Sequence, residues 1–481
     1  MGNLGGKIEH VVVLMLENRS FDSMLGRLYP GNPELDGLQG TESNPLQGGG
    51  EITVWNSGKF DRDSMSIPDP DPGELWNDIN MQLFGLGGKP GSAPPAMNGF
   101  VNNYVRQRDQ PAEKYRPESI MHYYTPEQIP VLSTLAKEFA VCDDWFASAP
   151  CQTWPNRFFL HCGTAAGYEN NSPIHPPYLM ETVFNRFSDP AAWKIYFHDF
   201  PQTLTLSRLW PHMDRFRLFE QEFALDAAAG KLPSYAFIEP RYFPDVKLPN
   251  DQHPPHHVGM GEDLIADVYN ALRKNEAAWK KTLLVILYDE HGGIHDHVPP
   301  PTAVMPDNTR SQPFAFDRYG VRVPAVLVSP YIKAGSILKR PQGSSAPFDH
   351  TSVIATLRKC FSLGTPISHR DAVAPDLECA LNLDTPGNPG PETVEPRPYA
   401  ISPGDVQDAL QAPLNDFQKA LHAAAAHLPA PDHGNLFESI ENHIENLVQG
   451  ILPEVPDHRT AADAIPFIRE KLQAFLKHAQ P

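Results

Sequence analysis

Two apolar runs that end in acidic or amide side chains constrain the fold of this chain more than any other feature. The run EHVVVLML leads directly into Glu17 and Asn18, and the run KTLLVILY leads directly into Asp289 and Glu290. Near-continuous Val, Ile and Leu are typical of strands that are buried on both faces, as in a parallel sheet. In open α/β sheets, functional groups collect beyond the carboxyl ends of the strands, so these four side chains are expected at one edge.

Further short β-rich segments alternate with helical patterns along the chain. The other expected strands are 138–145, 193–199, 234–240 and 322–330, and the expected helices are 126–138, 155–165 and 261–281. In the last helix, Leu264, Val268 and Leu272 recur at i, i+4 and i+8 and form one apolar face. This alternation predicts an α/β fold with a doubly wound sheet.

The length of 481 residues allows about three domains, or one large α/β domain with insertions. Residues 30–125 are rich in Gly, Pro, Asn and Asp, and we expect a long ordered excursion over the sheet. Its aromatic residues, among them Trp55, Trp76 and Phe84, favour packing over the alternative of disorder.

The predicted organisation has three parts. They are a catalytic domain (1–384), a Pro-rich linker (385–404) and a helical C-terminal region (405–481) with helices near 415–428, 434–451 and 460–478. The second of these helices carries an apolar stripe at Leu436, Ile440, Ile444 and Leu447. Core packing is the leading interpretation of the stripe, and contact with a partner or a membrane surface is the alternative.

Charge and signal patterns limit the partners and the compartment. The chain has 39 Lys and Arg against 58 Asp and Glu, a net charge of −19, which excludes general nucleic-acid binding and simple adsorption to anionic membranes. No run of 18 apolar residues and no secretory leader pattern occurs, so we expect no transmembrane segment and a cytoplasmic location. A leader that had been removed would instead indicate a secreted or periplasmic protein. Oligomeric state is left open.

Glu17, Asn18, Asp289 and Glu290 predict a divalent metal site. Carboxylate and amide oxygens are ligands of hard cations, and crowded carboxylates repel unless a cation neutralises them. A solvated strand end with helix-capping acids is the alternative for either pair alone. Oxygen ligands favour Ca²⁺, Mg²⁺ or Mn²⁺, and nearby histidines would also allow Zn²⁺ or Fe.

Thr153, in CQTWPNRFF, precedes a predicted helix whose first turn contains Pro155. A hydroxyl there lies at the positive end of the helix dipole, which favours an alkoxide or a bound phosphate. The alternative is an ordinary N-cap, worth about 1 kcal/mol. Neither the GxSxG elbow nor the GxxxxGK[ST] phosphate loop occurs.

Seven of the 20 histidines fall in three loops that follow predicted strands: His253, His256, His257, His291, His295, His297 and His350. Imidazoles there could bind a phosphoryl oxygen, ligate a metal or protonate a leaving group, although a single histidine is more often a surface or packed residue. The helical HExxH spacing of metalloproteases is absent.

Seven motifs follow one another along the chain: ENRSFDSMLG, TWPNRFF, IEPRYF, DQHPPHHV, YDEHGGIHDHVPPP, VPAVLVSPYI and FDHTS. In sequence and in order, they resemble the phosphoesterase family of non-specific phospholipases C and related acid phosphatases. That family lies within the alkaline phosphatase superfamily, and the resemblance covers roughly residues 8–360. It implies an alkaline-phosphatase-like sandwich with a central, mostly parallel sheet flanked by helices, to which the C-terminal helices are appended.

Carried over residue by residue, the resemblance implies that Glu17, Asn18, Asp289 and Glu290 bind the metal and that Thr153 is the nucleophile. It also implies that His253, His256 and His350 bind phosphate or act as acid–base groups. His257 is a less certain neighbour, and Asp296 and His297 are supporting residues.

Three functions are weighed. The leading hypothesis is a metal-dependent phospholipase C that cleaves phosphatidylcholine-like phosphodiesters through a phosphothreonine intermediate. The second is a broad-specificity acid phosphatase acting on phosphomonoesters, and the third is a catalytically inactive binding protein on the same fold.

Overall fold

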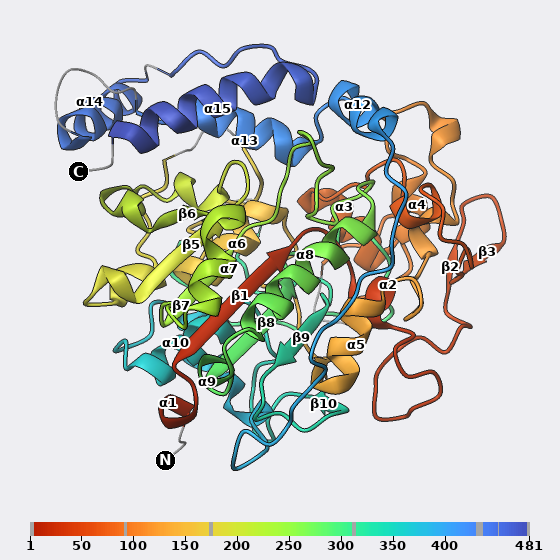
Figure 1. Cartoon of the computed structure of the whole chain (residues 1–481). Coiled ribbons are helices and arrows are strands. Elements are labelled where there is room, and N and C mark those ends of the chain that lie inside the picture. Colours follow the sequence, from red (N-terminus) through yellow and green to blue (C-terminus); the bar gives the residue numbers. More distant parts are fainter. Residues whose placement is uncertain are drawn as a thin grey trace.

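An eight-stranded sheet forms the centre of the computed structural model, which describes residues 4–90, 94–172, 177–309, 314–429, 436–450 and 452–478. The strand order is β10-β4-β9-β8-β1-β7-β5-β6. The strands are β1 (His10–Leu16), β4 (Ala140–Cys142), β5 (Trp193–Phe197), β6 (Phe216–Leu218), β7 (Tyr235–Ile238), β8 (Thr282–Tyr288), β9 (Ala325–Val328) and β10 (Ser336–Leu338). Only β9 runs antiparallel to its neighbours, β8 and β4, so the predicted α/β fold with a mostly parallel sheet is confirmed (Figure 1).

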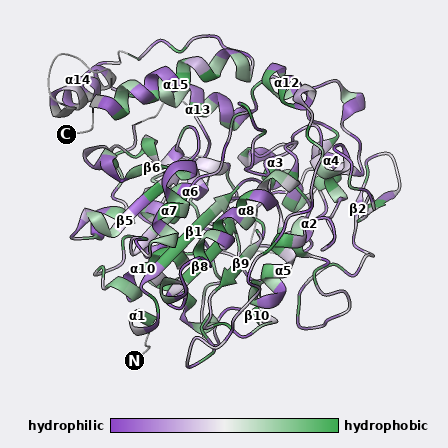
Figure 2. Ribbon diagram, viewed as in Figure 1, coloured by the Kyte–Doolittle hydropathy of each residue, from purple (hydrophilic) through white to green (hydrophobic). Residues whose placement is uncertain are grey.

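The two central strands are the apolar runs that the sequence marks most clearly. All residues of β8 are buried, and so are all residues of β1 except His10, as expected for strands covered on both faces. Figure 2 shows these strands as a hydrophobic centre beneath helices of mixed character. In the parallel register Leu16 lies opposite Tyr288, so Glu17 and Asp289 leave the sheet side by side.

Helices cover both faces of the sheet; in Figure 1, α5, α7 and α8 lie in front and α10 lies behind. The helices of this body are α1 (Leu4–Lys7), α2 (Phe21–Leu25), α5 (Pro130–Glu138), α6 (Thr153–Cys162), α7 (Phe219–Ala228), α8 (Val258–Leu272), α9 (Glu276–Trp279), α10 (Thr351–Phe361) and α11 (His369–Val373). The helix expected over 261–281 is divided into α8 and α9, because the Asn275 side chain accepts from Ala278 N–H and begins a new helix.

The described parts of the 30–125 excursion, residues 30–90 and 94–125, pack on a second hydrophobic cluster that also contains Ile294 and Val321. It contains β2 (Ser43–Pro45), β3 (Glu51–Thr53), α3 (Trp76–Phe84) and α4 (Phe100–Tyr104). Ile79, Leu83 and Phe100 are buried together in that cluster. Trp76 stacks on Phe314 with ring centroids 3.9 Å apart.

The C-terminal region contains α12 (Pro403–Gln411), α13 (Asp416–Ala426), α14 (Leu436–Val448) and α15 (Ala461–His478), which run along one end of the molecule in Figure 1. Helix α12 was not predicted, although Ser402, Pro403 and Asp405 form a capping box with Pro in the first turn. No helix in the described ranges is both long and apolar enough to cross a bilayer.

Residues 385–404 pack against α5 and α8 rather than standing clear of the protein. Asn270 and Val394 exchange hydrogen bonds, Tyr269 OH donates to the Pro391 carbonyl, and Asn388 donates to the Glu138 carbonyl. The division at 384 and 404 into domain, linker and tail stays a prediction. The side chains of the stripe residues Leu436, Ile440, Ile444 and Leu447 lie outside the described residues.

Candidate active site

The residues predicted to bind metal come together where β1 and β8 end. Glu17, Asn18, Asp289 and Glu290 have no solvent exposure. Asn18 adopts a left-handed backbone with φ of 52°, a conformation that Asn tolerates better than most residues. Its N–H donates to Asp289 Oδ1 at 3.0 Å, and the Arg19 N–H donates to the Glu290 carbonyl. The ends of the two strands are therefore joined directly.

Arg157, which the sequence analysis did not single out, lies between two of these acids. Its Nε donates to Asp289 Oδ2 at 3.1 Å, and its Nη2 donates to Glu17 Oε1. Arg157 follows Thr153 by four residues in α6, so both side chains lie on one helix face. That spacing could have identified it.

The Thr153 hydroxyl is directed at the strand ends and does not cap its own helix. Thr153 is the first residue of α6, and Gln152 takes the N-cap position without a side-chain cap bond. Thr153 Oγ1 lies 3.4 Å from both Glu17 Oε2 and Asn18 Oδ1, and the residue is fully buried. The N-cap alternative therefore does not describe what this hydroxyl does.

The electrostatics of the strand ends favour a bound cation. Burial raises the pKa of Glu17 well above its ordinary value, although the Arg157 guanidinium opposes the shift. Burial and the neighbouring Asp289 carboxylate raise the pKa of Glu290 in the same way. Glu290 Oε1 is buried and has no hydrogen-bond partner among the described residues. Glu17, Asn18, Asp289 and Glu290 offer oxygen donors of the type that a divalent metal takes, although the carboxylates of Glu17, Asp289 and Glu290 do not form a compact group with all ligand atoms within 4.8 Å, and their binding of one metal stays a prediction.

Two predicted histidines lie on the loop that follows β7. His256 Nδ1 is 2.7 Å from Asp251 Oδ1, and the Asp251 carbonyl accepts from Glu17 N–H at 2.9 Å, which ties this loop to the end of β1. Burial lowers the pKa of His253 to about 4, and its Nδ1 donates to the Pro254 carbonyl. His257, in contrast, caps α8 by accepting from Gly259 N–H. Asp251 was quoted in the motif but not identified as a site residue.

His350 has both ring nitrogens engaged. Its Nε2 is 2.6 Å from the Asp289 carbonyl, to which it donates, and Trp145 Nε1 donates to its Nδ1 at 3.4 Å. Burial lowers its pKa to about 3, so the ring is neutral. The bond to the carbonyl holds the peptide that carries Asp289, while an acid–base role stays a prediction.

Asp296 and His297 form an ion network beside the strand ends. His297 binds Asp22 through Nδ1 and Asp36 through Nε2, and Arg322 binds both Asp22 and Asp296. The network joins the ENRSFD and DHV motifs, which fits a supporting role.

Two acids from the excursion also reach the strand ends, and sequence reasoning missed both. Asn18 Nδ2 donates to Glu74 Oε1 at 2.5 Å. His253 approaches Asp71 through Nδ1 and Glu74 through Nε2, at 3.8 and 4.0 Å. Burial, followed by the charges of Asp71 and Glu290, raises the pKa of Glu74 well above its ordinary value. No local pattern in PDPDPGE indicates this placement.

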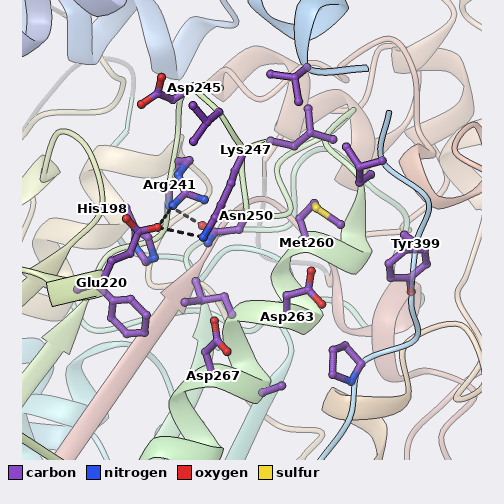
Figure 3. A pocket seen from close by; sticks show the side chains of 18 of the residues that line it. His198, Glu220, Arg241, Asp245, Lys247, Asn250, Met260, Asp263, Asp267 and Tyr399 are labelled. Carbon is purple, nitrogen blue, oxygen red and sulfur yellow. Dashed lines mark hydrogen bonds and ion pairs between the residues drawn. The ribbon is translucent and has the colours of Figure 1, made fainter. Parts of the chain in front are cut away.

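A cavity of about 1270 Å³ lies beside the site and not within it. It is lined by α7, α8, the loop around Arg241 and the segment near Tyr399, and it reaches Asn250 but none of the predicted catalytic or metal-binding residues. Figure 3 shows Glu220 paired with Arg241 and Lys247 on one side, with Asp263 and Asp267 projecting from α8.

Comparison with known proteins agrees with the motifs. "Non-specific phospholipase C3" of Arabidopsis thaliana is 38% identical over 456 residues, which cover 90% of this chain and 84% of that protein. "Non-specific phospholipase C1" of the same plant is 35% identical, with coverage of 98% and 86%. "Phospholipase C A" of Mycobacterium tuberculosis (strain H37Rv) is 29% identical, with coverage of 79% and 78%. The Phosphoesterase family model matches residues 8–364, in agreement with the resemblance, and the chain belongs to the phosphoesterase family.

Proposed function

We propose that this protein is a metal-dependent phospholipase C, which hydrolyses phosphatidylcholine-like phosphodiesters to diacylglycerol and a phosphorylated headgroup. The observation that carries the proposal is the Thr153 hydroxyl, which lies at the start of α6 and 3.4 Å from oxygens of Glu17 and Asn18. Family membership and the names of the relatives support the same chemistry.

Thr153 acts as the nucleophile. Its hydroxyl donates to Glu17 Oε2, and as the oxygen attacks phosphorus the proton passes to that carboxylate. The bond from phosphorus to the glycerol oxygen breaks and leaves a phosphothreonine that still carries the headgroup on phosphorus. A divalent metal held by Glu17, Asn18, Asp289 and Glu290 would supply a Lewis acid that lowers the pKa of the hydroxyl and polarises the phosphoryl group.

His256 is assigned to protonate the departing diacylglycerol oxygen. Asp251 orients the ring through Nδ1, which leaves Nε2 to donate the proton. Water then attacks phosphorus and His256 takes its proton, while the Thr153 oxygen leaves, recovers its proton from Glu17 and releases the phosphorylated headgroup. His350 and the buried His253 are positioning residues in this scheme.

Product analysis tests the substrate class. With phosphatidylcholine vesicles, we expect equal amounts of diacylglycerol and phosphocholine. Turnover of p-nitrophenyl phosphate alone would refute the phospholipase and favour the acid phosphatase. No turnover of either ester by the metal-loaded protein would favour the inactive binding protein.

Thr153 variants test the nucleophile. We expect Thr153→Ala to abolish turnover and Thr153→Ser, which retains a hydroxyl, to keep a substantial part of it. Acid-quenched wild-type protein that has turned over phosphatidylcholine should carry the phosphorylated headgroup, phosphocholine, esterified to Thr153 by mass spectrometry. Near wild-type turnover by Thr153→Ala would remove this residue from the mechanism.

Metal analysis tests the shared site at the strand ends. Glu17→Ala and Asp289→Ala are each expected to lower the bound metal, whereas Glu113→Ala, at an exposed acid of the excursion, should leave it unchanged. Unchanged metal content in both site variants would refute the assignment.

A further inference from the structure

Asp71, Glu74 and His253 form a compact group of ligand atoms beside the predicted metal site. One ligand atom from each lies within 4.8 Å of the others. Ligands on opposite sides of a divalent ion are separated by about twice the bond length, or about 4–5 Å for bonds of about 2.0–2.6 Å. The group therefore has the dimensions of a site for a single ion.

The orientation of His253 suits a metal ligand. Its Nδ1 donates to the Pro254 carbonyl at 2.6 Å, and the side chain is only 1% exposed. In the neutral ring the lone pair then resides on Nε2, which lies 4.0 Å from Glu74 Oε1. Metal-binding histidines commonly donate their other N–H to a backbone carbonyl in this way.

Two carboxylate oxygens at this place are buried without a hydrogen bond from any described residue, Asp71 Oδ1 and Glu290 Oε1. The carboxylates of Asp71 and Glu74 are also repelled by that of Glu290. Arg157 is already paired with Glu17 and Asp289, and the Arg19 guanidinium donates to the backbone carbonyls of Gln252 and Ile67. Among the described residues the Arg19 charge acts on Asp71, but the side chain that approaches both Asp71 and Glu74 within ion-pair distance is that of His253.

We propose that Asp71, Glu74 and His253 bind a second divalent metal ion, adjacent to the one predicted at Glu17, Asn18, Asp289 and Glu290. Two carboxylates and one imidazole favour Mn²⁺ or Zn²⁺ over Ca²⁺ and Mg²⁺. The hydrogen bond from Asn18 Nδ2 to Glu74 connects the two sites. The role of the ion rests on the proposed function, in which neighbouring ions would hold a phosphodiester from two sides.

The test counts Mn²⁺ on the intact, metal-stripped and reloaded chain by mass spectrometry and records its electron paramagnetic resonance spectrum. We expect two ions per wild-type chain with a spin-coupled spectrum. Asp71→Asn and Glu74→Gln, alone and combined, should bind one ion with an uncoupled spectrum. Glu74→Gln keeps an oxygen that can accept from Asn18. Asp69→Asn makes the same change at an exposed residue of this segment and should bind two ions.

One ion in the wild-type chain, or two ions in the combined variant, would overturn the proposal. If the combined variant fails to fold, the single Glu74→Gln substitution decides by the same count. The count is independent of turnover, so two ions on a chain without phospholipase activity would refute the proposed function and leave the second site standing. One ion in every variant, with weaker binding of phosphatidylcholine but not of phosphatidic acid, would instead assign Asp71 and Glu74 to a cationic headgroup.

Discussion

Arg157 gives the sharpest stability prediction, because its guanidinium lies between Glu17 and Asp289 and all three side chains are fully buried. Arg157→Leu removes the cation and leaves two carboxylates without it. Deleting one partner of a buried ion pair costs about 3–5 kcal/mol, since the remaining charge stays away from water. Replacing the arginine and its acidic partners together by apolar residues of similar volume would not cost this free energy, because no buried charge would be left.

The expected change in melting temperature follows from the length of the chain. Unfolding entropy near 60 °C is about 2.1 cal/mol/K per residue, so 481 residues give about 1 kcal/mol/K. A loss of about 3–5 kcal/mol therefore lowers the Tm of the metal-free protein by about 3–5 °C.

Calorimetry in the presence of a chelator measures this change. Arg186→Leu makes the same substitution in a half-exposed pair with Glu181, which is worth about 0–1 kcal/mol and so about 1 °C or less. Addition of Mn²⁺ should restore part of the loss in Arg157→Leu, because the freed carboxylates gain a cation. A Tm within error of that of Arg186→Leu would refute the assignment of Arg157 as the neutralising charge of the strand ends.

Three further outcomes are expected. Asp251→Asn should lower kcat by about 10²-fold or more with little change in KM, because His256 loses the group that orients it; an unchanged kcat would count against His256. Hydrogen bonds to Asp22 and Asp36 outweigh burial and raise the pKa of His297 to about 10 from 6.5. Its stabilisation is complete below pH 6.5 and lost as pH rises through 10, so the Tm of wild type should fall over this range more than that of His297→Gln. Chelation followed by dialysis should abolish turnover and Mn²⁺ should restore it; full activity of metal-free protein would refute metal dependence.

The elements that could be predicted are those governed by local rules. Glu17 and Asp289 were expected together because parallel strands deliver their next residues to one edge, and the register of Leu16 with Tyr288 agrees. The same burial pattern is shared by parallel and antiparallel strands, so nothing in residues 322–330 indicated that β9 runs the other way. Direction depends on the path of the preceding connection.

The residues that were missed are placed by long-range packing. Asp71 and Glu74 lie in a Pro-rich segment without hydrophobic periodicity, and their position depends on how the excursion packs on a cluster that it shares with Ile294 and Val321. Arg157 differs, because its four-residue spacing from Thr153 is a local signal that helix geometry makes readable. The Gly- and Pro-rich composition identified the excursion, but the positions of Asp71 and Glu74 beside the strand ends are seen only in the tertiary structure.

The active site is covered by a part of the excursion that is attached to a C-terminal segment, residues 395–408, which we call the strap. Thr153, Glu17 and Asn18 have no solvent exposure, so a lipid can reach them only if covering groups move. Glu74 is one of these groups through its bond to Asn18. The segment that leads to Glu74 is attached to the strap by Arg62, which lies 2.6 Å from Asp405, and by Arg397, whose guanidinium lies 3.6 Å from the Phe60 ring centroid.

Arg62→Ala should therefore ease access without unfolding the protein. The Arg62 side chain is 49% exposed, and an exposed ion pair contributes about 0–1 kcal/mol, so opening should become easier by at most about fivefold. We expect kcat/KM on phosphatidylcholine vesicles to rise within that limit, with little change in Tm. Arg106→Ala, at an exposed arginine of the same excursion that contacts Gln47 instead of the strap, is the control. A kcat/KM for Arg62→Ala equal to or below that of Arg106→Ala would show that the strap does not restrain the segment carrying Glu74, and the attachment would then be only a surface contact.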